Sequence, residues 1–259
     1  MRRVIIVQAR MGSTRLPGKV MLDLGGRPML ARQIAHLQRC LLVDEIVIAT
    51  TTDARDDILA DLASQEGVRC FRGSEDDVLG RYLGAARMTS ADVIARITGD
   101  CPLIDPAIVD GVFREALDHS SCCDYASNVI ARTYPRGLDT EVVFFDALCR
   151  ADRLATSSLA REHVTTFIYA ERPDLFLIRS VTDTEDNSFL RWTVDTVEDF
   201  QAVRALFEEL DLATRPRPYR EVLAYARAHP ELGRMNAGVA TWQPPGMPGR
   251  AGAARRQDS

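Results

Sequence analysis

The chain has 259 residues, 46% of them hydrophobic, and a formal net charge of −5. This length and composition suit one large hydrophobic core, and the acidic balance excludes a protein that holds nucleic acid by general electrostatics, which requires a basic face. No run approaches the roughly 18 apolar residues of a membrane span, and the N-terminal residues lack the features of a secretory signal. We therefore expect a cytoplasmic protein with neither a membrane nor a nucleic-acid partner.

The first half of the chain alternates short apolar runs with amphipathic segments. Continuous apolar runs predict buried strands at residues 4–7, 44–51, 68–73 and 93–98. Helical spacing, together with start and stop signals such as Pro28, Ser74 as an N-cap and Gly67, predicts helices within residues 24–40, 53–67, 74–90 and 105–120. This order predicts parallel strands with helices on both faces of the sheet and a ligand site at the carboxyl ends of the strands.

The second half of the chain is less regular. Strands are predicted at residues 138–145, 175–181 and 190–194, and helices at residues 159–173 and 197–210. Because no linker divides the chain, we predict one α/β domain over residues 1–240, within which residues 122–190 form a partly separate region for the acceptor or for dimerisation. Residues 241–259 are rich in Pro, Gly and Arg with little to bury, which predicts a disordered tail.

The loop after the first strand resembles a phosphate-binding loop but does not match the known patterns. A P-loop requires four residues between its two glycines and a hydroxyl after its lysine. Here five residues separate Gly12 from Gly18, and Val20 stands at the hydroxyl position. The G-x-G-x-x-G pattern of dinucleotide-binding folds is absent as well.

The chemistry of an anion site is nevertheless present in this loop. Small residues allow backbone N–H groups to approach an anion, and Arg10, Arg15 and Lys19 would neutralise its charge. The loop therefore indicates a binding site for a triphosphate.

Two aspartates follow apolar runs at positions where a metal ligand is expected. Asp100 comes directly after residues 93–98, and Asp195 follows residues 190–194. A carboxylate at the end of a strand faces the ligand crevice, although turn capping for Asp100 and a helix start for Asp195 remain alternatives. Mg²⁺ retains water and shares the phosphates of its substrate, so one or two protein ligands suffice.

Several segments, kept in order along the chain, resemble one enzyme family. They are ARMGSTRLPGKVM with GGRPML after it, then ITGDCPLIDP, REHVT and RWTVDTVEDF. These motifs resemble the cytidylyltransferases that activate sugars with CTP. The resemblance is greatest to the branch of the spore coat polysaccharide biosynthesis protein F, and is more distant to 3-deoxy-manno-octulosonate and acylneuraminate cytidylyltransferases. It covers about residues 3–210 and implies a three-layer α/β/α nucleotidyltransferase fold with a mixed, mostly parallel sheet, a homodimer, and Mg²⁺ as the cofactor.

The resemblance also implies roles for individual residues. The Asp of the G-D-x-P turn and the first Asp of V-D-T-x-E-D bind metal in the family, which points to Asp100 and Asp195. The phosphates of CTP would be bound by Arg10, Arg15 and Lys19, and these three residues with Asp100 are the expected catalytic set. The residues expected to contact the nucleotide are Ala9, Met11, Gly12, Ser13, Thr14 and Thr98.

Two further segments, TYPRGLDTEV and SSLAREHVT, resemble family segments that lie near the acceptor. A carboxylate or phosphate on the acceptor would favour a bidentate arginine. A solvated helix face for Arg161 and an ordinary hydrogen-bonded histidine for His163 are the alternatives. The candidate acceptor-binding residues are Asn128, Arg136, Asp139, Glu141, Arg161 and His163.

The expected reaction is transfer of CMP from CTP to a sugar or sugar-acid-like acceptor, with release of pyrophosphate, in the synthesis of surface polysaccharide or glycoconjugate precursors. Three positions depart from the better-known sugar-acid enzymes: Gln8 replaces a common proline, and Thr98 and Cys101 replace a usual Gln and Glu. These changes leave the contacts to the base and to the acceptor open. A glycosyltransferase of similar fold, whose usual D-x-D motif this sequence lacks, and a non-catalytic scaffold remain alternatives.

Overall fold

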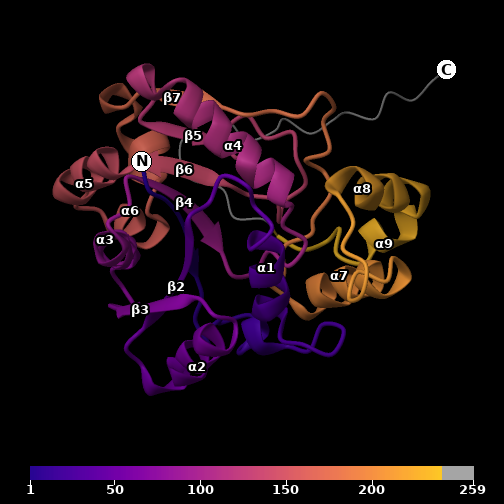
Figure 1. Ribbon diagram of the computed structural model, residues 1–259. Coiled ribbons are helices and arrows are strands. Elements are labelled where there is room, and N and C mark those ends of the chain that lie inside the picture. The colour runs from indigo at the N-terminus through magenta and orange to yellow at the C-terminus, as the bar shows by residue number, and fades with distance from the viewer. Residues whose placement is uncertain (241–259) are drawn as a thin grey trace.

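A computed structural model describes residues 1–240, so the predicted disordered tail at residues 241–259 lies outside the described part of the chain. One seven-stranded sheet runs through the molecule in the order β3-β2-β1-β4-β6-β5-β7 (Figure 1). Its strands are β1 (Arg3–Gln8), β2 (Glu45–Thr51), β3 (Arg69–Gly73), β4 (Val93–Thr98), β5 (Tyr125–Ser127), β6 (Glu141–Phe144) and β7 (Ile178–Ser180).

Helices cover both faces of this sheet. In the described residues, no helix has the length and apolar character needed to cross a membrane. The helices are α1 (Met29–Leu37), α2 (Asp57–Gln65), α3 (Val78–Thr89), α4 (Pro106–Asp118), α5 (Phe145–Leu154), α6 (Ser158–His163), α7 (Val197–Glu209), α8 (Tyr219–Ala228) and α9 (Pro230–Arg234).

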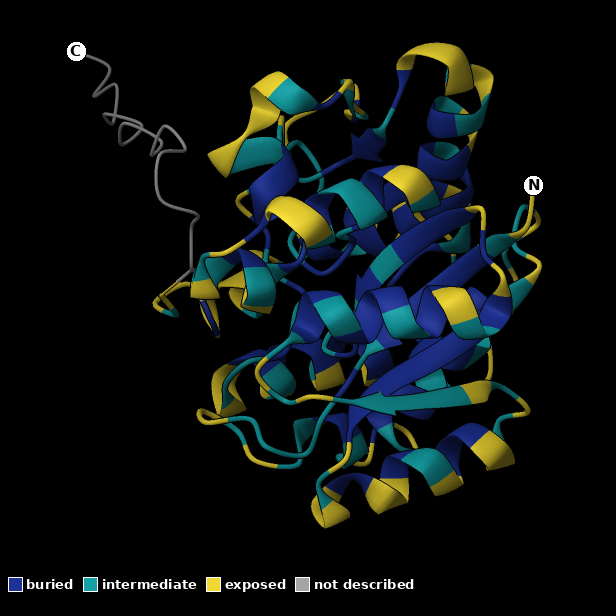
Figure 2. Ribbon diagram, turned by 90° about the vertical axis from the view of Figure 1, so that its left-hand side faces the viewer, coloured by how far each residue is buried: buried dark blue, intermediate teal, exposed yellow. Residues whose placement is uncertain are grey.

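The alternation of side chains along β1 explains why its sequence is continuously apolar. Ile5 and Val7 pack in the core formed with α1, α2 and α4, whereas Val4 and Ile6 pack in the core formed with α3, α5 and α6. A central strand is therefore buried on both faces, as Figure 2 shows for the strands at the middle of the sheet.

The pairing of the strands confirms the predicted mixed, mostly parallel sheet. β1 pairs in parallel with both β2 and β4, and β2 pairs in parallel with β3. β6 runs antiparallel to β4 and to β5, and β5 is parallel to β7. From β1 the chain adds β2 and β3 on one side and then crosses to β4 on the other side. Correspondingly, α1 and α2 pack on one face of the sheet and α3 on the other. Open α/β sheets bind ligands at the point where the strand order reverses, here between β1 and β4.

A third hydrophobic core lies beyond the sheet, where α7, α8 and α9 gather at one side of the molecule (Figure 1). Trp192, which is 4% exposed, and Leu138 pack in this core against α7 and α8. Trp192 is thus a core residue.

The predicted strand at residues 190–194 is not formed. Only an isolated parallel bridge joins Arg136 to Arg191, because this segment runs past the end of the sheet against the loop that contains Gly137. Gly137 has φ +105°, and a Cβ there would lie 2.5 Å from the backbone of Trp192. The close approach of two backbones therefore replaces a ladder of hydrogen bonds.

Two predicted helices also differ from the structure at their ends. α3 is capped by Asp77, whose carboxylate accepts from the N–H of Gly80, whereas the hydroxyl of Ser74 accepts from the N–H of Asp77. The predicted N-cap at Ser74 was therefore wrong.

The predicted helix at residues 159–173 is broken at Val164. This residue has φ 59° and ψ −67°, and the N–H of Thr165 donates to the carbonyl of His163 at 2.6 Å. These angles describe the γ-turn with positive φ, which is rare and strained, more so for a β-branched residue. α6 therefore ends at His163, and a π-helical turn at Phe167–Glu171 follows.

Candidate active site

Two chain segments meet where β1 and β4 end side by side. Gln8 and Thr98 are paired in the register of the two strands, and the N–H of Gly99 donates to the carbonyl of Gln8 at 2.8 Å. A Cβ at position 99 would lie 3.0 Å from that carbonyl oxygen, so the close approach requires glycine. The loop at residues 9–20 is thereby held beside Asp100, as expected from the sequence.

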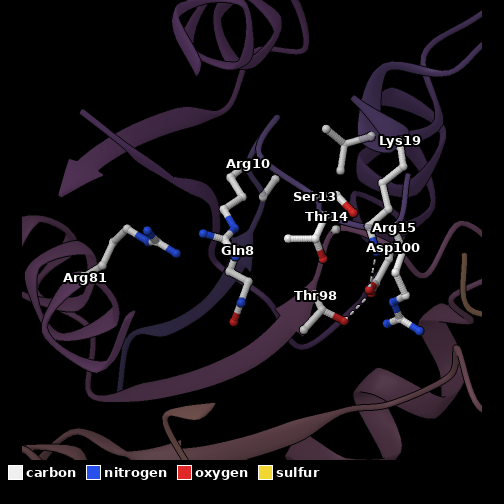
Figure 3. A pocket seen from close by; sticks show the side chains of 12 residues that line it. Gln8, Arg10, Ser13, Thr14, Arg15, Lys19, Arg81, Thr98 and Asp100 are labelled. Carbon is white, nitrogen blue, oxygen red and sulfur yellow. Dashed lines mark hydrogen bonds and ion pairs between the residues drawn. The ribbon is translucent and has the colours of Figure 1, made fainter. Parts of the chain in front are cut away.

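A polar cavity, here called the loop cavity, opens between these two segments (Figure 3). Four of its lining residues are basic and one is acidic, so the cavity is suited to an anion. Eight residues that the sequence predicted to bind phosphate or metal, or to contact the nucleotide, line this cavity. Six of them belong to the loop after β1, and two belong to β4 and the turn that follows it. The lining residues are Gln8, Ala9, Arg10, Ser13, Thr14, Arg15, Lys19, Val20, Arg81, Thr98, Gly99 and Asp100.

Met11 and Gly12, both predicted to contact the nucleotide, do not line the loop cavity. The N–H of Met11 donates to Asp56 at 2.8 Å, and its carbonyl accepts from the N–H groups of Ser13 and Gly18 at 3.0 and 2.9 Å. Met11 therefore sets the conformation of the loop from which its neighbours reach the cavity.

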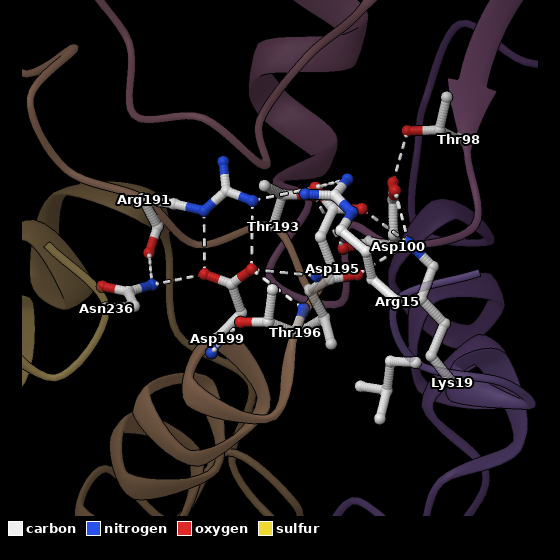
Figure 4. Close-up of polar contacts among 12 residues, drawn as sticks. Arg15, Lys19, Thr98, Asp100, Arg191, Thr193, Asp195, Thr196, Asp199 and Asn236 are labelled. Atoms are coloured by element: carbon white, nitrogen blue, oxygen red, sulfur yellow. Dashed lines mark hydrogen bonds and ion pairs between the residues drawn. The ribbon is translucent and has the colours of Figure 1, made fainter. Parts of the chain in front are cut away.

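Lys19 lies between the two predicted metal ligands (Figure 4). Its ammonium group donates to Asp100 at 3.0 Å, to Asp195 at 2.8 Å and to the carbonyl of Val194 at 2.8 Å. Burial alone would lower the pKa of Lys19, but the two carboxylates outweigh this effect and raise it. The two aspartates, distant in sequence, thus surround one positive charge.

The side chain of Asp100 is oriented by its sequence neighbours. Thr98 donates its hydroxyl to the second carboxylate oxygen at 2.6 Å, and the thiol of Cys101 lies 3.4 Å from the same oxygen. Burial would raise the pKa of Asp100, but Lys19 and these hydrogen bonds hold it below its ordinary value. Two of the positions that depart from the sugar-acid enzymes therefore contact the carboxylate expected to bind metal.

Asp195 is held by two arginines in addition to Lys19. Arg15 approaches it at 3.1 Å and Arg191 at 2.8 Å. Arg191 also donates twice to Asp199, at 2.8 and 3.0 Å, and Asp199 is fully buried in the capping box that starts α7. Arg191 therefore links the start of α7 to the orientation of Asp195.

Sequence reasoning gave no role to Arg191 or Asn236. Asn236, 3% exposed, donates its amide to Asp199 at 2.9 Å and to the carbonyl of Arg191 at 3.0 Å. The spacing of four residues between Arg191 and Asp195 was a usable signal, but the strand wrongly predicted there would have placed the two side chains differently. No local pattern points to Asn236.

The geometry of Asp100 and Asp195 fits a divalent cation. Their carboxylate oxygens both lie within hydrogen-bonding distance of one ammonium group, so they already converge on one positive charge. In residues 1–240, no group of three or more His, Cys, Asp or Glu side chains could hold a metal ion. Two carboxylates suit Mg²⁺, which takes its other ligands from water and phosphate.

Arg161 and His163 lie at a second cavity, here called the side cavity, which shares Gln8, Arg10 and Arg81 with the loop cavity. Arg161 donates twice to Asp77, at 2.8 and 2.6 Å, and also pairs with Asp152 at 2.8 Å. Burial lowers the pKa of His163, which favours the neutral imidazole. These two candidate acceptor residues therefore adjoin the predicted nucleotide site.

The other candidate acceptor residues lie in the wall built by β5 and β6. Asn128 is buried, donating to the carbonyl of Leu138 at 2.7 Å and accepting from the N–H of Thr140 at 2.9 Å. Asp139 forms a bidentate ion pair with Arg132, whose two terminal nitrogens donate to the two carboxylate oxygens at 2.5 and 2.7 Å.

Glu141 is 4% exposed and pairs with Arg96, whose side chain is 13% exposed. The hydroxyls of Tyr125 and Thr165 also donate to it, each at 2.5 Å. Arg136 reaches the segment before Asp195 through its backbone bridge to residue 191. Asn128, Asp139 and Glu141 are thus engaged within the protein, and the contact of these four residues with an acceptor stays a prediction.

The sequence and the fold match characterised relatives. A model of the family described as cytidylyltransferase matches residues 4–215. The spore coat polysaccharide biosynthesis protein SpsF of Bacillus subtilis (strain 168) is 36% identical over 215 residues, which are 80% of this chain and 86% of that protein. A 3-deoxy-manno-octulosonate cytidylyltransferase of Trichlorobacter lovleyi is 39% identical over 112 residues, 42% of this chain and 43% of that protein.

The fold agrees with these matches. The structure of a cytidylyltransferase from Leptospira borgpetersenii serovar Hardjo-bovis has a TM-score of 0.85 and 30% sequence identity, covering 94% of this chain and 100% of that one. The resemblance and the nucleotidyltransferase fold expected from the motifs are both confirmed. The chain belongs to the cytidylyltransferase family.

Proposed function

We propose that this protein transfers CMP from CTP to a hydroxyl group of a sugar or sugar-acid-like acceptor and releases pyrophosphate, with Mg²⁺ as its cofactor. The observation that carries the proposal is the position of Lys19 between Asp100 and Asp195, at the edge of a cavity with excess positive charge. Two relatives, a 3-deoxy-manno-octulosonate cytidylyltransferase and a spore coat polysaccharide biosynthesis protein, support a sugar-like acceptor and a role in the synthesis of surface polysaccharide precursors.

The residues of the loop cavity would each bind one part of the substrate. Arg10, Arg15 and Lys19 would bind the triphosphate, since their positive charges are complementary to its negative charge. Asp100 and Asp195 would hold Mg²⁺, which when bound supplies positive charge to the phosphate oxygens.

The chemical step is a displacement at the α-phosphorus. The oxygen of the acceptor hydroxyl forms a bond to this phosphorus and its proton passes to solvent. The bond from the α-phosphorus to the bridging oxygen breaks, and its electron pair leaves on pyrophosphate. Arg10 and Arg15 would stabilise the charge that develops on the leaving group, and the protein contributes mainly by positioning the two substrates.

A pyrophosphate-release assay tests this function. The protein is incubated with Mg²⁺, each of the four nucleoside triphosphates, and a panel of carboxylated, phosphorylated and amino sugars. We expect acceptor-dependent release with CTP. A parallel incubation replaces the triphosphate by a nucleotide sugar, and its consumption without pyrophosphate release would instead identify a glycosyltransferase. No turnover with any combination would favour a non-catalytic scaffold.

We also propose that the protein acts as a homodimer in the cytoplasm, where CTP is available. The short strand β7 lies at one edge of the sheet, and Leu177 next to it is 54% exposed. This edge belongs to the region at residues 122–190 and could pair with a second copy. A strictly monomeric sedimentation coefficient at micromolar concentration would contradict the dimer.

A further inference from the structure

Arg81, on α3, is a buried arginine for which the sequence predicted no role. It is 3% exposed, and one terminal nitrogen donates to the carbonyl of Ser74 at 2.8 Å. Its Nε is buried and has no hydrogen-bond partner within residues 1–240. No carboxylate among the described residues forms an ion pair with its guanidinium. A buried cation left in this state is costly, so a ligand that accepts hydrogen bonds from it would be favoured.

The position of Arg81 is built into the local structure. Its aliphatic stem packs on Gly73 at the end of β3, where an added Cβ would lie 3.3 Å from Cγ of Arg81. The guanidinium extends toward Gln8 and Arg10 (Figure 3), and all three residues line both the loop cavity and the side cavity. Arg81 therefore faces the space where a substrate of this site would lie.

The cations of the loop cavity differ in their access to solvent. The side chains of Arg10 and Arg15 are 40% and 50% exposed, whereas Arg81 is 3% exposed. Pyrophosphate must leave during the reaction, which suits the open side of the cavity. The closed side, at Arg81, suits a part of the substrate that is retained and desolvated, namely the nucleoside.

We propose that Arg81 binds the pyrimidine base of the nucleotide by donating to O2 and N3 of cytosine; this inference rests on the proposed function. O2 and N3 are adjacent acceptors on one edge of the ring, and a guanidinium presents two donors at matching spacing. Uracil carries a hydrogen on N3, so one buried donor would face another donor. Such a mismatch is strongly disfavoured where water cannot enter.

Binding measurements on variants at position 81 test this proposal. Dissociation constants of CTP, UTP and inorganic tripolyphosphate are measured by calorimetry with Mg²⁺ for wild type, Arg81→Gln and Arg81→Lys. We expect the preference of wild type for CTP over UTP to fall about 10- to 100-fold in Arg81→Gln, the range of discrimination given by one bidentate pair. Arg81→Lys keeps the positive charge but loses the pair of parallel N–H donors of the guanidinium, so it should also lose most of the preference for CTP over UTP. Affinity for tripolyphosphate should not change.

Arg87→Gln is the matched control, because Arg87 is an exposed arginine on the same helix. It should leave all three dissociation constants unchanged. Circular dichroism and the melting temperature report whether Arg81→Gln is folded, and Arg81→Lys replaces it if it is not.

Each other outcome overturns the inference. An unchanged ratio of CTP to UTP affinity in folded Arg81 variants rules out base recognition. A parallel loss of tripolyphosphate affinity makes Arg81 a phosphate ligand, and a rise in KM for an anionic acceptor alone assigns it to the acceptor in the side cavity. Failure of wild type to bind CTP or to release pyrophosphate is a separate result, because it rejects the proposed function before any variant is considered.

Discussion

The ion pairs at the loop after β1 differ in their number of partners from the ion pair between Arg96 of β4 and Glu141 of β6. At the edge of the loop cavity charges are shared: Lys19 contacts two carboxylates, and Asp195, next to the cavity, contacts three cations. In the wall, Arg96 and Glu141 form a closed pair, with side chains 13% and 6% exposed, and two hydroxyls complete the hydrogen bonds of Glu141. A side chain with several charged partners at a cavity can exchange one of them for a charged group of a ligand. Separating a shielded pair such as Arg96 and Glu141 would leave one charge unpaired inside the protein.

This difference separates function from stability. Groups of the first kind should control turnover with little effect on folding, and groups of the second kind should control folding. Four variants test that separation, from the largest expected effect to the smallest.

Replacing Asp100 by Asn should lower the rate of pyrophosphate release by about 10²-fold or more, because a carboxylate expected to hold Mg²⁺ at the reacting phosphate is lost. The melting temperature should remain close to that of wild type, since Asn keeps the shape and Lys19 keeps Asp195 as a partner. Asp92→Asn, at the opposite end of β4, is the control and should leave the rate unchanged. A wild-type rate in Asp100→Asn would contradict the assignment.

Replacing Glu141 by Gln should lower the free energy of unfolding by about 3–5 kcal/mol, because Arg96, whose side chain is mostly shielded from solvent, loses its counter-charge. Chemical denaturation measures this change. The control is Glu208→Gln, whose pair with Arg204 is exposed and should contribute less than about 1 kcal/mol. Unchanged stability combined with a higher KM for the acceptor would instead make Glu141 an acceptor contact.

Replacing Asn236 by Ala should weaken binding of a divalent cation about 10-fold, since groups that orient metal ligands typically have effects of this size. Asn236 acts through Asp199 and Arg191 on Asp195. Titration of the protein with Mn²⁺, followed by electron paramagnetic resonance, measures the affinity directly.

Asn187→Ala is the matched control for this variant. Asn187 is also a buried asparagine near α8, but its side chain donates to Asp183, to the carbonyl of Glu185 and to Tyr219, and accepts from Arg227. Asp199 is not among these partners in the described residues. Equal loss of Mn²⁺ affinity in both variants would show a general loosening of the C-terminal helices.

The smallest effect is expected in the dependence of stability on acid. Burial would raise the pKa of Asp139, but the adjacent Arg132 more than offsets this and holds it below its ordinary value. A carboxyl group with a lowered folded-state pKa stabilises the fold above its unfolded pKa of about 3.9, and this contribution is lost as the pH falls through the folded-state pKa.

Below about pH 4, wild type should therefore lose stability more steeply than Arg132→Met, in which the pKa of Asp139 is no longer held down by a charge. Denaturation curves at a series of acid pH values measure the two slopes. Identical slopes would show that the pair with Arg132 does not set the pKa of Asp139.

Local patterns predicted the elements that depend on local physics. The apolar runs in β1, β2 and β4 identified strands because a central parallel strand is buried on both faces. The prediction failed where contacts distant in sequence decide the conformation. Residues 190–194 look like a strand, but the approach of Gly137 leaves them without a ladder, and the helix at residues 159–173 is interrupted by the γ-turn at Val164.

Sequence alone identified the cationic loop at residues 9–20, the family and the two aspartates, because these features lie in contiguous motifs. Metal binding by the two aspartates stays a prediction. Tertiary structure decided which charges meet. Lys19 lies 81 positions from Asp100 and 176 from Asp195, and the parallel pairing of β1 with β4, together with the packing of α7, brings them together. Within residues 1–240, the fold leaves Arg81 buried without a carboxylate partner, since the pairing of a charge depends on neighbours in space rather than in sequence.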